Sequence, residues 1–287
     1  MEKLQQNIEI GLIGGTGSDI ALNNFKEIKV YTPFGNTSST ISIGDFKGKN
    51  VAYIPRHGQD HIIPPHNINF RANIWALKEL GVKFLISPSA VGSLKKEHTK
   101  GKFILVDQYI DRTKKREDTF YEGGQLCHIG QVNPYCEYLN DIFYQAGKES
   151  KLTIQKGGIY VCIEGPRFST RAESKMFRRW EGDIVGMTTY PEVVLAAEKE
   201  ICYCCIAMVT DLDVWAGKCP NCGIVEYAQR CYKCGSVVDE LSVNVPEVLE
   251  TMTQNAENLK KLLELALEKL DTRRDCPCHH SLKDALL

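Results

Sequence analysis

Apolar runs rich in β-branched residues alternate along this chain with segments whose apolar positions recur at helical spacing. Helical spacing marks residues 71–81, 169–180 and 245–270. Residues 183–201 combine a short strand, a loop and a helix. Buried strands are predicted over residues 8–15, 49–58, 82–94, 101–111, 157–168 and 202–213. This alternation predicts one α/β domain over residues 1–287, with a central, mostly parallel or mixed sheet flanked by helices.

Polar motifs follow several of these strands. Ligands of open α/β sheets bind at the carboxyl ends of strands, so we expect the motifs to converge on one cleft. The loop "GGTGS" (14–18) fits an anion site built from backbone N–H groups and Thr16, but it fits a plain tight turn equally well. It is not a dinucleotide fingerprint, because Ile20 stands where the third glycine would be. Arg56 and His57 add a guanidinium and an imidazole after the next strand.

A pair of carboxylates ends the strand at residues 202–213. Asp211 and Asp213 are two residues apart, and one member of such a pair can keep a proton at neutral pH. A helix cap or a solvated turn is the alternative interpretation. Short polar stretches also end strands at residues 89–93, 164–168 and 186–192.

Four cysteines stand out between these acids and the last helix. Cys219, Cys222, Cys231 and Cys234 form two Cys-x-x-Cys pairs, which is the spacing of a closed tetrahedral zinc site. We interpret residues 217–236 as a zinc knuckle inserted in a loop, with a structural rather than a catalytic ion. A redox dithiol pair and a nucleic-acid module are the weaker alternatives.

Charge and composition limit the partners. The net charge of −1 offers no basic excess for a polyphosphate backbone, so nucleic acid is not expected as a partner. No signal peptide and no run of about 18 apolar residues is seen, which predicts a cytoplasmic protein without a membrane partner.

The other eight cysteines fall into two groups. Six of them are predicted to be free thiols that are buried as small apolar side chains in a reducing compartment. In a hyperthermophile, disulfides among them would become plausible. These six are Cys127, Cys136, Cys162, Cys202, Cys204 and Cys205. Cys276 and Cys278 form "CPC" in front of two histidines. This favours a flexible tail over residues 271–287 or a Cys-x-Cys disulfide, and a second metal site is the other alternative.

Taken together, the motifs resemble the trimeric purine nucleoside phosphorylase superfamily, and within it the methylthioadenosine phosphorylases. The resemblance covers residues 11–270 without the knuckle. It is carried by "IGLIGGTG", "PRHGQDH", "NFRANIWALKELG", "AVGSL", "DQYIDRTKKREDTFY", "EGPRFSTRAES", "MTTYPEVVLAAE" and "IAMVTDLD". It implies a pentosyltransferase of purine and methionine salvage, which uses inorganic phosphate as co-substrate and releases adenine and 5-methylthioribose 1-phosphate from 5′-methylthioadenosine.

The resemblance also implies a role for each site residue. Asp211 is the general acid at purine N7, and Asp213 accepts from the 6-amino group. The family's phosphate site corresponds to Thr16, Arg56, His57, Ser89, Ala90 and Thr188. The nucleoside contacts correspond to Phe168 at the base, Met187 at the ribose, and Val243, Val248 and Leu249 at the 5′ group. His128 corresponds to a histidine given by a neighbouring subunit, which implies a homotrimer or a dimer of trimers.

Two positions bear on the choice of base. Enzymes of the family that act on 6-oxopurines carry Glu where Ser169 stands and Asn where Asp211 stands. The present pair favours a 6-aminopurine. The alternatives are a 6-oxopurine or methylthioinosine phosphorylase and, less favoured, an inactive scaffold with a zinc-ribbon binding role. In the family the inserted knuckle would occupy the active-site gate, so we expect zinc to hold that gate or a subunit contact.

Overall fold

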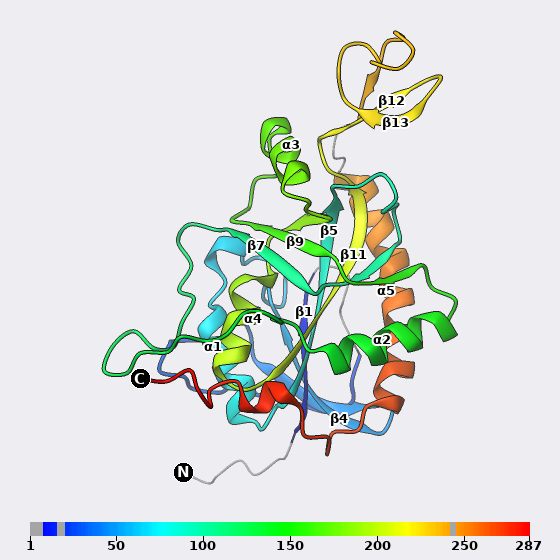
Figure 1. Ribbon diagram of the computed structural model, residues 1–287. Helices are drawn as coiled ribbons and strands as arrows, with labels where there is room; N and C mark the ends of the chain where they lie inside the picture. Colours follow the sequence, from blue (N-terminus) through cyan, green and yellow to red (C-terminus); the bar gives the residue numbers. More distant parts are fainter. Residues whose placement is uncertain (1–7, 16–20, 242–244) are drawn as a thin grey trace.

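The computed structural model describes residues 8–15, 21–241 and 245–287. Figure 1 shows a large twisted sheet between helices, with a small hairpin projecting from one end. The order of eight strands is β2-β3-β4-β1-β5-β10-β9-β7, and β11, β6 and β8 branch from β5 to complete an 11-stranded sheet within these residues. The strands are β1 (Ile10–Gly14), β2 (Asn23–Ile28), β3 (Ile41–Phe46), β4 (Lys49–Pro55), β5 (Phe84–Ser93), β6 (Phe103–Leu105), β7 (Gln108–Arg112), β8 (Ile154–Lys156), β9 (Ile159–Ile163), β10 (Ile184–Gly186) and β11 (Cys202–Leu212).

The central pair of strands is β5 and β11, which run parallel in register from Cys202 opposite Phe84 onward. Successive side chains of a strand point to opposite faces. Along β11, Tyr203 and Cys205 therefore enter one hydrophobic core and Cys204 and Ile206 enter the other. A strand buried on both faces needs a continuous apolar run, which is the pattern seen in the sequence.

Helices cover both faces of the sheet. One core contains side chains of α1 and α4, and the other contains side chains of α2 and α5. The helices are α1 (Phe70–Glu79), α2 (Glu137–Glu149), α3 (Arg171–Arg179), α4 (Thr189–Glu198) and α5 (Val245–Lys269), with 3-10 turns η1 (Pro65–Asn67) and η2 (Pro277–His280). The predicted α/β fold with a mixed sheet is confirmed. No helix within the described ranges is both long and apolar enough to cross a membrane.

The projecting hairpin is the predicted knuckle. Strand β12 (Ala216–Cys219) pairs with β13 (Gly223–Glu226) and β14 (Asp239–Glu240) in a sheet of its own. A small cluster of buried side chains, Cys219, Val225, Cys231 and Val238, fills it. At its base, the indole N–H of Trp215 donates to the carbonyl of Ser93 at the end of β5, at 2.8 Å. The insertion is thereby attached to the central sheet.

The C-terminal segment lies against the body. The amide N–H of His128 donates to the carbonyl of Ala285 at 2.8 Å, and that of Leu287 donates to the carbonyl of Leu126 at 3.0 Å. Ser281 Oγ donates to the carbonyl of Ala197 at 2.6 Å. Residues 271–287 therefore contact the domain at several points along the segment. Their predicted flexibility stays a prediction.

Candidate active site

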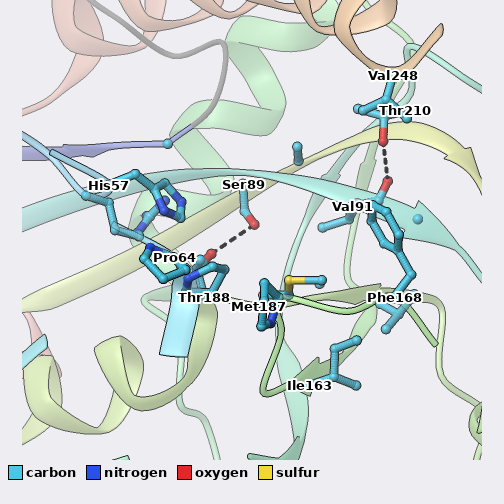
Figure 2. Close-up of a pocket in the computed structure, with 18 of the residues that line it drawn as sticks. His57, Pro64, Ser89, Val91, Ile163, Phe168, Met187, Thr188, Thr210 and Val248 are labelled. Atoms are coloured by element: carbon cyan, nitrogen blue, oxygen red, sulfur yellow. Dashed lines mark hydrogen bonds between the residues drawn. The ribbon is translucent and has the colours of Figure 1, made fainter. Parts of the chain in front are cut away.

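A cavity of about 480 Å³ opens at the carboxyl ends of β5 and β11. Its size suits a nucleoside-sized ligand. Figure 2 shows its walls, with His57 and Ser89 toward one end and Phe168 and Thr210 toward the other. The predicted residues that line it are Arg56, His57, Ser89, Ala90, Phe168, Ser169, Met187, Thr188, Asp211, Asp213 and Val248.

Four other predicted site residues are not among the described residues that line the cavity. Thr16 and Val243 lie outside the described residues, as does the side chain of Leu249. His128 is exposed and does not line the cavity of its own chain.

Hydroxyl groups form the first end of the cavity. Ser89 Oγ lies 3.1 Å from Thr188 Oγ1 and 3.0 Å from the hydroxyl of Tyr160, which the sequence analysis did not assign. Gly15 allows the first loop to approach closely, because a Cβ atom there would lie 2.6 Å from Arg56 Nη1. Hydroxyls, a guanidinium and nearby backbone are the groups that bind phosphate in proteins.

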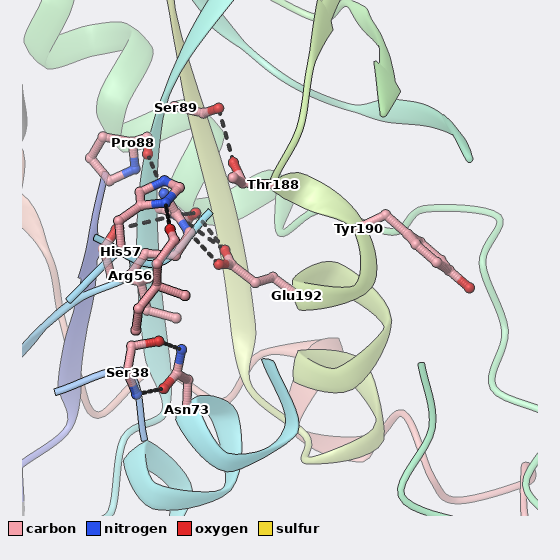
Figure 3. A network of polar contacts seen from close by, with 12 residues as sticks. Ser38, Arg56, His57, Asn73, Pro88, Ser89, Thr188, Tyr190 and Glu192 are labelled. Atoms are coloured by element: carbon pink, nitrogen blue, oxygen red, sulfur yellow. Dashed lines mark hydrogen bonds and ion pairs between the residues drawn. The ribbon is translucent and has the colours of Figure 1, made fainter. Parts of the chain in front are cut away.

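Arg56 is buried and paired with a carboxylate that the sequence analysis missed. Its Nε donates to Glu192 Oε1 at 2.5 Å, and its Nη2 donates to Glu192 Oε2 at 3.2 Å (Figure 3). Nη2 also donates to Ser87 Oγ at 2.6 Å. Both ion-pair partners are almost fully buried, so each compensates for the other's loss of hydration. Glu192 therefore fixes the guanidinium in place. In the sequence, Glu192 is distinguished only as an acidic residue near the start of an apolar helix.

His57 is a neutral imidazole at pH 7. Burial, together with the charge of Arg56, lowers its pKa to about 4. The ring N–H at Nδ1 donates to the carbonyl of Ile63 at 2.8 Å. Nε2 is then the unprotonated nitrogen, which can accept a hydrogen bond from a phosphate hydroxyl but brings no positive charge.

A β-bulge positions the first acid at the other end of the cavity. The pairing of β11 with β5 shifts where Val209 lies opposite Val91 and Asp211 lies opposite Gly92, so that Thr210 is the extra residue. Burial raises the pKa of Asp211 to about 6. Thr210 Oγ1 donates to Asp211 Oδ1 at 2.7 Å and opposes that rise, whereas the charge of Asp213 adds to it. A carboxyl with this pKa can deliver a proton near neutral pH.

The second acid has an unpaired oxygen. Burial also raises the pKa of Asp213. Asp213 Oδ2 and Ser169 Oγ are buried and have no hydrogen-bond partner among the residues that the structure describes. The hydroxyls of Ser169 and Ser174 are close enough to lower the pKa of Asp213, without reaching hydrogen-bond geometry. Two unpaired polar atoms in the wall of a cavity favour a ligand that supplies both a donor and an acceptor.

Apolar side chains separate the two polar ends. Met187 and the half-exposed Phe168 were expected there, and Val248 of α5 closes one side. The sequence analysis missed several others, which come from a loop, a 3-10 turn, two strands and helix α5: Ile62, Pro65, Ile163, Val185 and Met252. A ligand with a polar anion at one end, a heteroaromatic base at the other and an apolar middle fits this arrangement.

The four knuckle cysteines come together as predicted. Their ligand atoms all lie within 4.8 Å of one another, and the sulfurs of Cys219 and Cys234 are 3.4 Å apart. A tetrahedral site with zinc–sulfur bonds of about 2.3 Å has sulfur–sulfur edges of about 3.8 Å. The donor set and the spacing of the cluster therefore suit a zinc ion.

Comparison with known proteins gives a consistent result over nearly the whole chain. The model of the phosphorylase superfamily matches residues 9–268. The S-methyl-5′-thioadenosine phosphorylase of Nitrosopumilus maritimus is 45% identical over 284 residues, which cover 98% of this chain and 99% of that protein. The enzyme of the same name from Saccharolobus solfataricus is 44% identical over 293 residues, covering both chains completely.

Solved structures show the same similarity. A methylthioadenosine phosphorylase from an antarctic soil metagenomic library is 36% identical, with a TM-score of 0.84 over 98% of this chain and 93% of that chain. A mutant adenosine/methylthioadenosine phosphorylase of Schistosoma mansoni, in complex with methylthioadenosine, is 33% identical, with a TM-score of 0.78 over 91% of both chains.

Proposed function

Because the chain belongs to the phosphorylase superfamily, and within it to the S-methyl-5′-thioadenosine phosphorylases, we propose a role in one reaction for each polar group of the cavity. The enzyme cleaves the N-glycosidic bond of 5′-methylthioadenosine with inorganic phosphate. The products are adenine and 5-methylthioribose 1-phosphate. The unpaired buried oxygens at Asp213 and Ser169, beside Asp211 with its raised pKa, carry the assignment of the base end.

Phosphate binds at the hydroxyl end. Ser89 and Thr188 donate to its oxygens, and Arg56 supplies the positive charge that Glu192 holds in place. His57, neutral at pH 7, accepts from a phosphate hydroxyl through Nε2. The backbone of Ala90 and the hydroxyl of Thr16 complete this set as predictions from the sequence. A phosphate fixed in this way presents one oxygen to the anomeric carbon without the entropy cost of a free collision.

The bond breaks with its electron pair moving onto the purine. As C1′ acquires oxocarbenium character, negative charge spreads over the purine ring to N7. Asp211 delivers its proton there and becomes a carboxylate, while a phosphate oxygen forms the new bond to C1′. Asp213 Oδ2 accepts from the 6-amino group, and this hydrogen bond stabilises the ionised form of Asp213 against its burial.

The sugar lies between these ends. Met187 packs against the ribose and Phe168 against the base, and Val248 contacts the methylthio group with Val243 and Leu249 as predicted neighbours. His128 of a neighbouring subunit closes the 5′ side in a homotrimer or a dimer of trimers. Exposed apolar side chains flank His128: Leu126 is 57% exposed and Val132 is 83% exposed. This is the character of a surface that another subunit covers. A cytoplasmic location remains a prediction from the sequence.

Zinc in the knuckle holds the gate beside the base. The hairpin contacts α3, where Lys175 Nζ lies 3.1 Å from Glu226 and the guanidinium of Arg171 lies 4.1 Å from the ring of Tyr227. Helix α3 begins at Arg171, two residues after Ser169. An ordered knuckle therefore supports the loop that carries the base-reading hydroxyl. The closed Cys₄ set leaves no open position for substrate, so the ion takes no part in the chemistry.

A substrate panel tests this proposal. Release of free base would be measured with and without phosphate for methylthioadenosine, adenosine, methylthioinosine and inosine. We expect phosphate-dependent release, with kcat/KM for methylthioadenosine at least about 100-fold above that for the two inosine forms, because a site with unpaired buried groups rejects the analogue that cannot pair them. A preference for the inosine forms would assign the base end to 6-oxopurines. No phosphate-dependent release from any of the four would favour the inactive scaffold.

A further inference from the structure

Four cysteines from three distant segments meet at the end of the molecule opposite the knuckle. Cys136 is the N-cap residue of α2, Cys202 is the first residue of β11, and Cys276 and Cys278 belong to the C-terminal turn at η2. Their four sulfur atoms all lie within 4.8 Å of one another. Figure 1 shows the knuckle at the top of the view and the C-terminal turn, in red, at the bottom. We call this group the basal cysteine cluster.

The spacing of the sulfurs is that of a shared ion. Cys136 Sγ lies 3.6 Å from Cys276 Sγ, which in turn lies 3.8 Å from Cys278 Sγ. A tetrahedral zinc–thiolate site has edges of about 3.8 Å, whereas a disulfide brings two sulfurs to about 2.05 Å. The knuckle, where the sequence itself predicts zinc, has a comparable separation of 3.4 Å between Cys219 and Cys234. The sulfur of Cys276 is in contact with the sulfurs of both Cys136 and Cys278, whereas a disulfide would join it to one sulfur alone.

A histidine beside the cluster is arranged as a donor to thiolate. The backbone N–H of Cys276 donates to His279 Nδ1 at 3.4 Å, so Nδ1 is the unprotonated ring nitrogen. The N–H at Nε2 then points to Cys202 Sγ at 3.4 Å. Hydrogen bonds from outer groups to ligand sulfurs are a regular feature of metal sites, because they stabilise the thiolate form.

The backbone around the cluster is fixed independently of the sulfurs. The amide of Cys136 donates to the carbonyl of Tyr203 at 2.8 Å, which ties the start of α2 to the start of β11. Ser281 anchors the following turn to α4 through the carbonyl of Ala197. Cys276 and Cys278 border a cavity of about 670 Å³ that gives an ion a path from solvent. The ligands are thus held close together before any ion binds.

We propose that the basal cysteine cluster is a second structural zinc site, formed by Cys136, Cys202, Cys276 and Cys278. Four thiolates close the coordination sphere, so the ion is structural and does not bind substrate. It ties the C-terminal segment to the central sheet. Strand β11 begins at this cluster, and Asp211 lies near its other end, about 30 Å from Cys202 at about 3.3 Å per residue. Loss of this ion should therefore lower thermal stability without changing the chemical step.

Zinc content of the full chain tests the proposal. We expect two zinc ions per purified chain by mass spectrometry of the metal. Cys222→Ser/Cys234→Ser removes the knuckle ligands and should leave one. Adding Cys278→Ser, at a half-buried position, should leave none, while Cys127→Ser outside both clusters should keep two. A single ion in the parent chain that disappears with the knuckle variant, together with disulfides at Cys136, Cys202, Cys276 or Cys278 in the intact mass, would overturn the proposal.

A second measurement does not depend on how the triple variant folds. In the knuckle variant, Co²⁺ replacing zinc should give the intense thiolate charge-transfer and visible bands of a tetrahedral sulfur site. Chelation of that ion should lower the melting temperature and leave kcat for phosphorolysis unchanged. Absence of the cobalt bands from a folded knuckle variant under reducing conditions would reject a metal at the basal cysteine cluster.

Discussion

Asp211 is the residue whose environment decides the chemistry. Its carboxyl is buried, which raises the pKa to about 6, and the neighbouring charge of Asp213 acts in the same direction. The hydroxyl of Thr210 acts in the opposite direction by donating to Oδ1 at 2.7 Å. The bulge at Thr210 thus sets the position of the acid, and the hydroxyl of Thr210 moderates its pKa.

The pH dependence of Thr210→Val distinguishes this arrangement from a structural role. The acid form of Asp211 is populated below its pKa of about 6, so kcat/KM of the parent enzyme should fall as pH rises through that value. Thr210→Val removes a hydrogen bond that favours the carboxylate. The pKa of Asp211 should therefore rise in this variant, and the fall of kcat/KM should occur at higher pH than in the parent enzyme. The measurement is kcat/KM for methylthioadenosine between pH 4.5 and 9, in about 12 steps.

Asp211→Asn is the companion variant. An amide of the same shape has no proton to give, so kcat should fall by about 10²- to 10⁴-fold and the limb near pH 6 should disappear. Asp213→Asn serves as the matched control, because it removes a neighbouring charge but not the acid itself. It should retain the limb, displaced to lower pH. If the limb persisted unchanged in Asp211→Asn, another group would be the acid.

Residue identities at strand ends were predictable, but their partners were not. Arg56 and His57 were expected near a cleft from their place after a strand, and both side chains line the cavity. The sequence could not show that Arg56 is paired with Glu192, which lies 136 positions away. Nor could it show that burial beside Arg56 makes His57 neutral. Both effects arise from contacts between segments that only the fold brings together.

At the scale of elements, periodicity predicted the long segments best. The strand at 202–213 and the helix at 245–270 appear as β11 and α5, because each has an apolar pattern long enough to be distinctive. The segment expected as one strand at 101–111 is divided between β6 and β7. No element was assigned to α2, although Leu139, Phe143 and Ala146 recur at helical spacing in its buried face. That signal was present in the sequence.

The knuckle is an element whose order depends on its ligands. Two of its strands have four residues and the third has two. A hairpin of this size is marginally stable alone, so an ion at the four thiolates supplies much of its stability. Its contacts with α3 carry that order to the loop before this helix, which includes Ser169 in the wall of the cavity.

Cys222→Ser/Cys234→Ser tests the knuckle as a gate. We expect the KM for methylthioadenosine to rise about tenfold, equivalent to about 1.4 kcal/mol, because the ordering of the base-side loop must then be achieved on binding. Limited proteolysis should cut between residues 217 and 236 in this variant and not in the parent. Cys127→Ser is the control outside both cysteine clusters. Unchanged KM and unchanged cleavage would show that the knuckle does not support the gate.

At the scale of the whole molecule, the cavity of one chain is open to solvent. Ile62 and Phe168, which line it, are 75% and 49% exposed. The segment around His128 presents Leu126 and Val132 to solvent on the same molecule. A head-to-tail contact that places this segment of one subunit over the open cavity of the next would cover both surfaces. Such a contact closes into a ring when the rotation between subunits allows it.

His128→Ala makes this arrangement measurable. If His128 acts on a neighbour's cavity, the variant should raise the KM for methylthioadenosine several-fold and leave the KM for phosphate unchanged, since the phosphate end lies within one chain. Gln125→Ala, at an exposed position of the same segment, is the matched control. Light scattering should give about three or six times the chain mass of 32.3 kDa. Dilution that separates the subunits should raise the KM of the parent enzyme toward that of His128→Ala, whereas a monomer with the parent's KM at every concentration would contradict the shared site.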